Sequence, residues 1–242
     1  MEDESFKGQS RHALILGLSL IAAASIASAT FYAVKSFDNA LSVTGSAKQR
    51  IVSDSVKWVG SFTRSVPVSE LKSGYGQIDQ DAKAVVAYLK GEGLSDAAVV
   101  VSPVMLEEPY KYNPGMAQEY TLRQTVEVRS EDVQKIAALA KDVRPLVDKG
   151  LIFSTQSLEF YYTKLPELRV ELLSAAVKDA QDRAAKIAAS TGKGVGNLKA
   201  ASMGVVQVLP INSTDVSDYG AYDTSSIEKE VMVTVKTTFV LK

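Results

Sequence analysis

Residues 152–192, IFSTQSLEFYYTKLPELRVELLSAAVKDAQDRAAKIAASTG, place one strand directly before one long helix. Residues 152–163 are rich in aromatic and β-favouring side chains and are predicted as the strand. The helix opens at Pro166 and reaches about Thr191, with Gly192 just beyond it, a Pro-first and Gly-last arrangement. Apolar residues spaced alternately three and four apart predict its buried stripe. These residues are Val170, Leu173, Val177, Ala180, Ala184 and Ile187.

Two earlier segments alternate as half-buried strands do. In residues 51–66, a period of two puts four residues on one face, and Pro67 ends the segment. The residues on that face are Val56, Trp58, Gly60 and Phe62. In residues 118–129, a second alternation separates a largely apolar face from a charged one. The largely apolar face consists of Leu122, Gln124, Val126 and Val128.

The remaining elements complete the order of the chain. We expect helices over 69–90 and from 131 to Gly150, the second interrupted by Pro145. Strands are predicted over 41–49, 97–110, 198–209 and 227–241. The middle of this order, β-α-β-β-α-β, matches a split-βαβ (ferredoxin-like) arrangement. The predicted fold class is α+β, a largely antiparallel sheet with helices on one face.

The amino terminus carries the longest apolar run of the chain. Residues 13–34, ALILGLSLIAAASIASATFYAV, have no charge and would be about 33 Å long as a helix, enough to cross a membrane. We expect a cytoplasmic tail at 1–12, a retained signal-anchor helix at 13–35, a linker at 36–41 and an extracytoplasmic domain at 42–242. The alternative is a signal peptide cleaved after Ala29, since Ala27-Ser28-Ala29 is an A-x-A site.

Composition excludes several kinds of chemistry. The chain has no cysteine, and its single histidine, His12, lies before the apolar run. A Ser-His-Asp triad and cysteine or histidine metal sites in the domain are therefore excluded. A net charge of −1 gives no excess of positive charge with which to bind nucleic acid. We predict no cofactor, no metal and no enzymatic activity, with a hydrolase that uses carboxylates alone as the remaining catalytic alternative.

Three segments could carry chemistry, and each has a simpler explanation. Residues 191–196, TGKGVG, follow a helix, whereas phosphate loops precede one. Glu107, Glu108 and Glu119 could pair for acid–base work, but a solvated hairpin explains them. An Asp-rich loop could bind calcium, although its spacing is not that of an EF-hand. The loop residues concerned are Asn212, Asp215, Asp218 and Asp223.

Contacts with other molecules are predicted at two places. Ala180, Ala184 and Ile187 would let the long helix approach a second subunit closely, beside edge strands at both ends of the chain. A tyrosine-rich hairpin with Tyr110, Tyr112 and Tyr120 would contact a ligand or partner. The first favours a homo-oligomeric scaffold, and the second favours a binding module.

Four segments, in order, resemble the SIMPL-domain family. They are SVTGSAKQRIVSDSVKW from Ser42, YTLRQTVEVRSEDVQKI from Tyr120, the strand-helix-strand segment from Phe153 to Ser202, and the closing EVMVTVKTTFVL. Ser46-Ala47 departs from the Glu-Gly that many members have. The resemblance implies a bacterial envelope protein, at the inner membrane or in the periplasm, linked to oxidative-stress defence. It also implies assembly into a ring or channel-like barrel, and it brings no catalytic residues.

Overall fold

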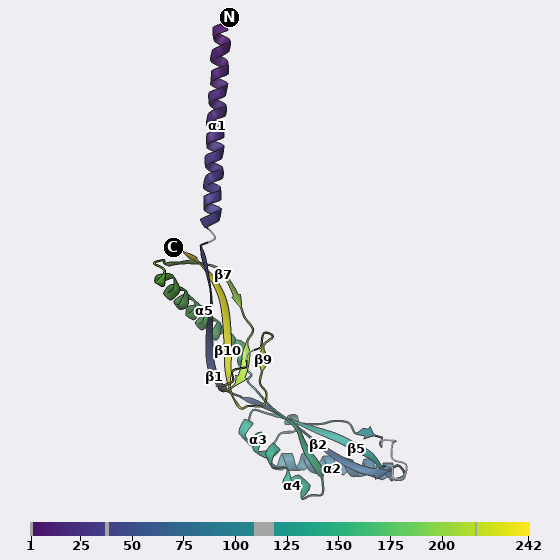
Figure 1. Ribbon diagram of the computed structural model, residues 1–242. Coiled ribbons are helices and arrows are strands. Elements are labelled where there is room, and N and C mark those ends of the chain that lie inside the picture. Colours follow the sequence, from purple (N-terminus) through teal and green to yellow (C-terminus); the bar gives the residue numbers. More distant parts are fainter. Residues whose placement is uncertain (1, 37–38, 109–118, 216) are drawn as a thin grey trace. The chain divides into compact units, whose positions relative to one another are not determined.

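The computed structural model describes residues 2–36, 39–108, 119–215 and 217–242 (Figure 1). The chain divides into two compact units. Unit 1 comprises Met1–Ala47, Leu173–Gly204 and Val233–Lys242, and unit 2 comprises Lys48–Leu172 and Val205–Met232. Three elements, β1, α5 and β10, have residues in both units.

The apolar amino-terminal segment is a single helix, α1 (Glu2–Ser36). Its stretch Leu14–Lys35 has a mean hydropathy of 2.1, and none of it is buried by the rest of the chain. A helix of this length and composition fits a single-pass membrane anchor or a signal sequence.

Unit 2 is built on an antiparallel sheet in the order β3-β5-β2-β6, with β4 also paired to β5. Helix α2 follows β2 and helix α3 follows β5, and both helices pack on one face of this sheet (Figure 1). This arrangement confirms the predicted split-βαβ core. The elements are β2 (Ser55–Pro67), α2 (Leu71–Gly91), β3 (Val99–Val101), β4 (Met105–Glu107), β5 (Glu119–Ser130), α3 (Val133–Lys141) and β6 (Ile152–Tyr161).

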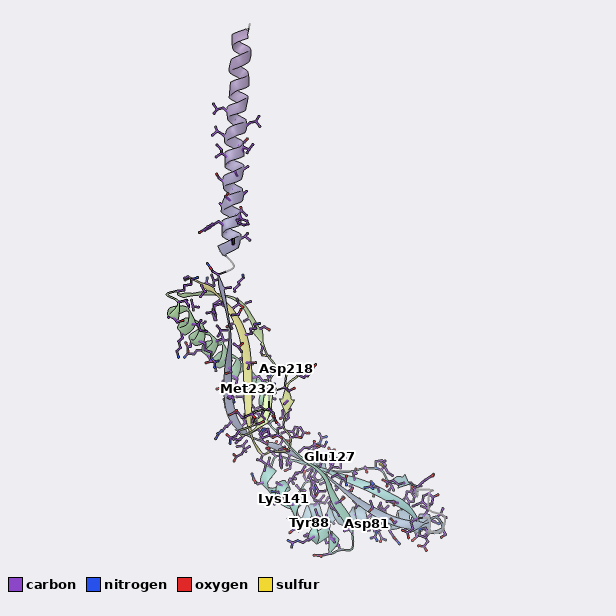
Figure 2. All side chains as sticks on the ribbon, viewed as in Figure 1. Asp81, Tyr88, Glu127, Lys141, Asp218 and Met232 are labelled. Atoms are coloured by element: carbon purple, nitrogen blue, oxygen red, sulfur yellow. The ribbon has the colours of Figure 1, made fainter. Side chains whose placement is uncertain are left out.

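The helix-covered face of this sheet carries the main core. Trp58 and Phe62 of β2 are fully buried, as the two-residue period predicted. At Gly60 an added Cβ would lie 2.2 Å from the ring of Phe153, so only glycine lets that ring cross the strand. Arg64 pairs on this face with Asp81 of α2 through two hydrogen bonds of 2.5 and 2.8 Å, and Figure 2 labels Asp81.

Two predicted elements of unit 2 are broken into shorter ones. The helix expected over 131–150 becomes α3 and α4 (Arg144–Val147), because Pro145 cannot donate the backbone bond that would continue α3. The strand expected over 97–110 becomes β3 and β4. Short 3-10 turns occupy Val68–Glu70 and Asp96–Ala98.

The second sheet has β10 (Glu228–Leu241) at its centre. On one side its neighbour is β1 (Ala40–Val52). On the other side, β8 (Gln207–Pro210) pairs with the first part of β10 and β7 (Val195–Met203) pairs with the rest. The short β9 (Ala221–Tyr222) pairs with β8 in parallel. In unit 1, α5 (Leu165–Ser190) packs on this sheet around Val43, Ala184 and Phe239.

The buried stripe of α5 differs from the predicted one. Its members follow one another at four-residue intervals, whereas Val170 and Ile187 are exposed. They are Leu168, Leu172, Ala176, Ala180, Ala184 and Ala188. The alanines are selected because β1 approaches the helix backbone at Gly45, where an added Cβ would lie 2.2 Å from the carbonyl oxygen of Ala176.

Candidate functional site

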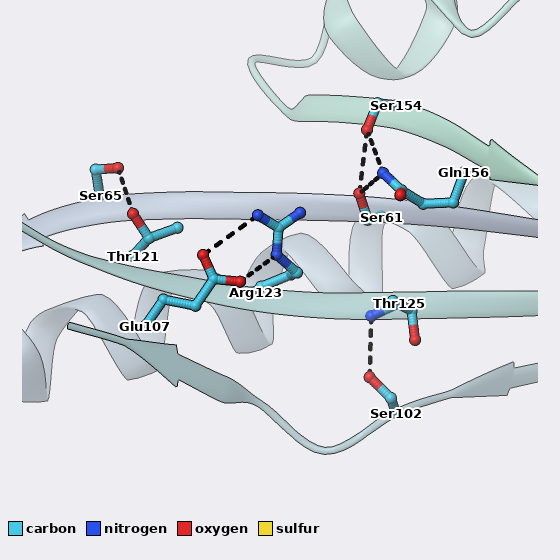
Figure 3. A network of polar contacts seen from close by, with 9 residues as sticks. All are labelled: Ser61, Ser65, Ser102, Glu107, Thr121, Arg123, Thr125, Ser154 and Gln156. Carbon is cyan, nitrogen blue, oxygen red and sulfur yellow. Dashed lines mark hydrogen bonds and ion pairs between the residues drawn. The ribbon is translucent and has the colours of Figure 1, made fainter. Parts of the chain in front are cut away.

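The face of the unit 2 sheet opposite α2 and α3 is polar. Ser61, Ser154 and Gln156 form a hydrogen-bonded group, with Gln156 Nε2 2.8 Å from Ser61 Oγ (Figure 3). Arg123 pairs with Glu107 at 2.6 Å across neighbouring strands, and this bond lowers the pKa of the Glu107 carboxyl. Side chains of both charges and many hydroxyls therefore cover the face that the helices leave open.

A hollow of about 240 Å³ lies at one end of this sheet, where three turns of the chain meet. The turns follow β1, β5 and β6. Asp54 closes the hollow by accepting two hydrogen bonds from Thr163, one from the backbone N–H and one from the hydroxyl, each 2.8 Å long. Its lining residues are Asp54, Ser55, Glu131, Thr163 and Lys164.

Two tyrosines are hydrogen-bonded to the backbone that borders the hollow. Tyr161 is the register partner of Ser55, and its carbonyl accepts the N–H of Asp54 at 2.9 Å. The rings of Tyr161 and Tyr222 are 6.2 Å apart between centroids and inclined by 33°. The phenol of Tyr161 donates to Glu159, which raises the pKa of Tyr161 and lowers that of Glu159. Lys57 Nζ lies 3.7 Å from the same carboxylate.

Tyr222 is held in place although 41% of it is exposed. Its phenol oxygen accepts the N–H of Tyr162 at 3.0 Å. Beneath its ring lies the ammonium of Lys229, 5.3 Å from the centroid. This lysine is completely buried and donates to the carbonyl oxygens of Phe160, at 2.5 Å, and Asp223. Burial lowers the pKa of Lys229, because the charged form loses its hydration.

A family model described as SIMPL, protein of unknown function (DUF541), matches residues 41–239, which is more than half of the chain. The chain belongs to the SIMPL family. No curated protein matches the sequence. The SIMPL match begins within β1 and ends within β10, so it includes residues of both units and every residue of the hollow.

Of the tyrosines predicted as contacts of this SIMPL domain, Tyr120 lies in the described residues. Tyr120 is half-buried on the helix-covered side of β5, where its register partner is the buried Val66. Tyr110 and Tyr112 lie outside the described residues. Sequence reasoning missed Tyr222, whose signal was an aromatic residue within a polar loop. Only the pairing of β8 with β9 and β10 brings that loop to Tyr161.

The carboxylates considered for catalysis or metal binding are separated. Glu107 is paired with Arg123, and Asp223 accepts hydrogen bonds from Ser225 and Ser226. Burial alone would raise the pKa of Asp223, but these bonds and the charge of Lys229 lower it overall. Within residues 14–35, 39–108, 119–215 and 217–242, no group of three or more His, Cys, Asp or Glu could hold a metal ion.

The residues predicted for subunit contact divide into two groups. Ala180 and Ala184 are fully buried by the SIMPL domain's own strands, so they offer no surface to another chain. The small residues that suggested a subunit contact instead allow the close approach of β1. Ile187 is 46% exposed and stays a predicted contact.

Strand β7 is an uncovered part of the unit 1 sheet. Its residues Leu198, Ala201 and Met203 pair with Phe239, Thr237 and Val235 of β10 and share their face of the sheet. The three β10 residues are at most 5% exposed, whereas Leu198 and Met203 are 48% and 47% exposed. The cover that α5 provides therefore ends between β10 and β7. Leu198, Ala201 and Met203 are called the β7 strip below.

Proposed function

We propose that this SIMPL protein is a membrane-anchored scaffold that assembles with copies of itself, and that it has no catalytic activity. The anchor would be α1, with the SIMPL domain in the periplasm of a bacterium. A role in envelope or oxidative-stress defence is supported only by the family resemblance described above.

The β7 strip is the observation that carries the proposal. In the described residues the strand that pairs with β7 is β10, so no strand covers the other edge of β7 there. An open edge beside uncovered apolar side chains favours addition of a strand from another chain. The opposite edge of the sheet, β1, is partly closed, because Asp179 accepts the backbone N–H of Ser46 at 2.8 Å.

Attachment to a bilayer would favour assembly further. Copies held at one surface have a higher effective concentration than free copies. Edges of different kind on the two sides of a sheet permit head-to-tail contacts, which close into rings when the rotation between copies allows it. We therefore expect a discrete ring rather than an indefinite series of sizes.

The test is the mass of the full chain in a mild detergent, by light scattering, with electron microscopy of the same peak. The double variant Leu198→Glu/Met203→Glu is expected to yield smaller species, because charge on the β7 strip would be buried in the contact. Val100→Glu is the matched control, since Val100 is 60% exposed in unit 2. A monomeric wild-type protein, or equal masses for wild type and double variant, would contradict the proposal.

The intact mass of protein recovered from membranes tests the anchor separately. A chain that retains residues 1–35 supports the anchor. A chain that begins at Thr30 and leaves the membrane in salt would establish the cleaved alternative.

A further inference from the structure

We propose that the hollow lined by Asp54, Ser55, Glu131, Thr163 and Lys164, together with the rings of Tyr161 and Tyr222, binds one unit of an uncharged saccharide. The residues concerned all belong to unit 2. This proposal is independent of the assembly proposed above, because it uses neither β7 nor α1.

The size of the hollow suits a small ring. Sites for drug-sized ligands measure roughly 300–1,000 Å³. The hollow measures about 240 Å³, and its residue Ser55 is the register partner of Tyr161. One sugar ring would fit, with the rest of an oligosaccharide continuing over Tyr161 and Tyr222.

The rigidity of Tyr222 favours a binding role. A side chain that is already fixed loses little conformational entropy when a ligand arrives. Its phenol oxygen is fixed by Tyr162, and its ring by Lys229 and Tyr161, yet 41% of the residue remains exposed. A partly exposed aromatic ring that is held by such contacts can stack against the apolar C–H face of a sugar ring.

The polar lining provides partners of both kinds. The hydroxyl of Ser55 can donate and accept, whereas that of Thr163, which already donates to Asp54, can accept. The carboxylate of Glu131 accepts, and the ammonium of Lys164 donates. Sugar hydroxyls also do both. Because the Asp54 carboxylate is already oriented by its two bonds to Thr163, this end of the hollow is preorganised.

The charges favour a neutral ligand. In the lining, Asp54 and Glu131 stand against Lys164, and on the adjoining strands Lys57 and Arg129 stand against Glu159 and Glu127. These groups carry four negative charges and three positive ones, so an anionic ligand is disfavoured. A cationic ligand is disfavoured in addition, because the ammonium of Lys229 already interacts with the ring of Tyr222.

Isothermal titration of the full chain tests the proposal, in a zwitterionic detergent that has no sugar head group. The probes are cellotetraose and chitotetraose, with tetragalacturonate as the anionic comparison. We expect saturable binding of one uncharged probe with a Kd near 1 mM, as a small exposed site gives. Absence of binding by both at about 10 mM, or tighter binding of tetragalacturonate, would overturn the proposal.

Variants locate the site. Tyr222→Ala and Glu131→Gln are each expected to weaken binding by roughly tenfold or more, which corresponds to the loss of one stacking or hydrogen-bonding group. Glu131 is exposed, so its variant leaves the fold intact. Tyr219→Ala is the matched control, since that tyrosine lies in the same loop and is 96% exposed. Unchanged binding in Glu131→Gln, or equal loss in Tyr219→Ala, contradicts the assignment.

Discussion

The two units of this SIMPL protein are stabilised in different ways. Unit 2 buries large side chains, among them Trp58, Phe62 and Leu122, between its sheet and two helices. Unit 1 packs its helix onto its sheet around Val43, Phe239 and a row of alanines. Each fully buried large side chain stabilises a fold by about 1.5–3 kcal/mol, and an alanine contributes far less. The difference indicates that unit 1 depends on close backbone approach more than on large buried side chains.

The largest effect is expected in unit 2 from Trp58→Ala. The substitution removes a fully buried ring that contacts Phe153 edge-on at 5.9 Å and donates to Thr155 at 3.2 Å. A loss of about 3–5 kcal/mol in the free energy of unfolding is expected. Urea unfolding followed by circular dichroism measures it. A loss below about 1 kcal/mol would mean that the ring contributes little to the stability of the core.

Gly45→Ala tests the close approach in unit 1. The new Cβ would meet backbone atoms of α5, 2.2 Å from Ala176 O and 2.4 Å from Ala180 N, and neither can move aside freely. We expect a cost of about 2–3 kcal/mol and faster amide exchange in unit 1 peptides, with unit 2 peptides unchanged.

Gly76→Ala is the control for that substitution. Nothing lies within 4 Å of the Cβ it would add to α2, so a gain of about 0.5–1 kcal/mol is expected from helix propensity. Exchange that rises equally in both units for Gly45→Ala would show that they unfold together.

Lys229→Met examines the buried ammonium of unit 2. The variant relieves the cost of burying a charge but leaves the carbonyls of Phe160 and Asp223 without their donor. An orphaned buried carbonyl costs about 1–3 kcal/mol, so a net loss of roughly 1–2 kcal/mol is expected. Exchange should increase in residues 221–228. If this segment stays protected, its position depends on Asp223 and its serine partners instead.

The smallest effect is a dependence on pH in unit 1. The N–H of Ser46 and the side chain of Arg183 lower the pKa of Asp179. Its stabilising contribution is present above the ordinary aspartate pKa of about 3.9 and is lost as the pH falls through the lower, folded-state pKa. The urea midpoint of the wild type should therefore fall more than that of Asp179→Asn between about pH 5 and pH 2. Asp79→Asn, at an exposed aspartate paired with Lys83, should behave as the wild type.

The sequence could predict β2 and β5 of unit 2 because each of these strands has a single apolar face. In β2, the alternation of Val56, Trp58, Gly60 and Phe62 leaves a single apolar face, and that face is buried. The order of strands and helices then permits few topologies, and the observed split-βαβ order is among them.

The same reasoning failed on α5 because two apolar stripes overlap along it. One includes Val170 and Ile187, and the other includes Leu172 and Ala176. Hydropathy favours the first, whereas the contact at Gly45 selects the second, because only small side chains permit that distance. A choice that depends on the spacing between elements cannot be read from one helix.

The sequence by itself determined the apolar amino-terminal helix, the family and the split-βαβ core, because each depends on a local pattern or its order along the chain. Tertiary structure alone decided which stripe of α5 is buried, that β7 remains uncovered, and that Tyr161 and Tyr222 meet beside the hollow. Each of these depends on strands far apart in sequence lying side by side, since burial and contact are properties of neighbours in space.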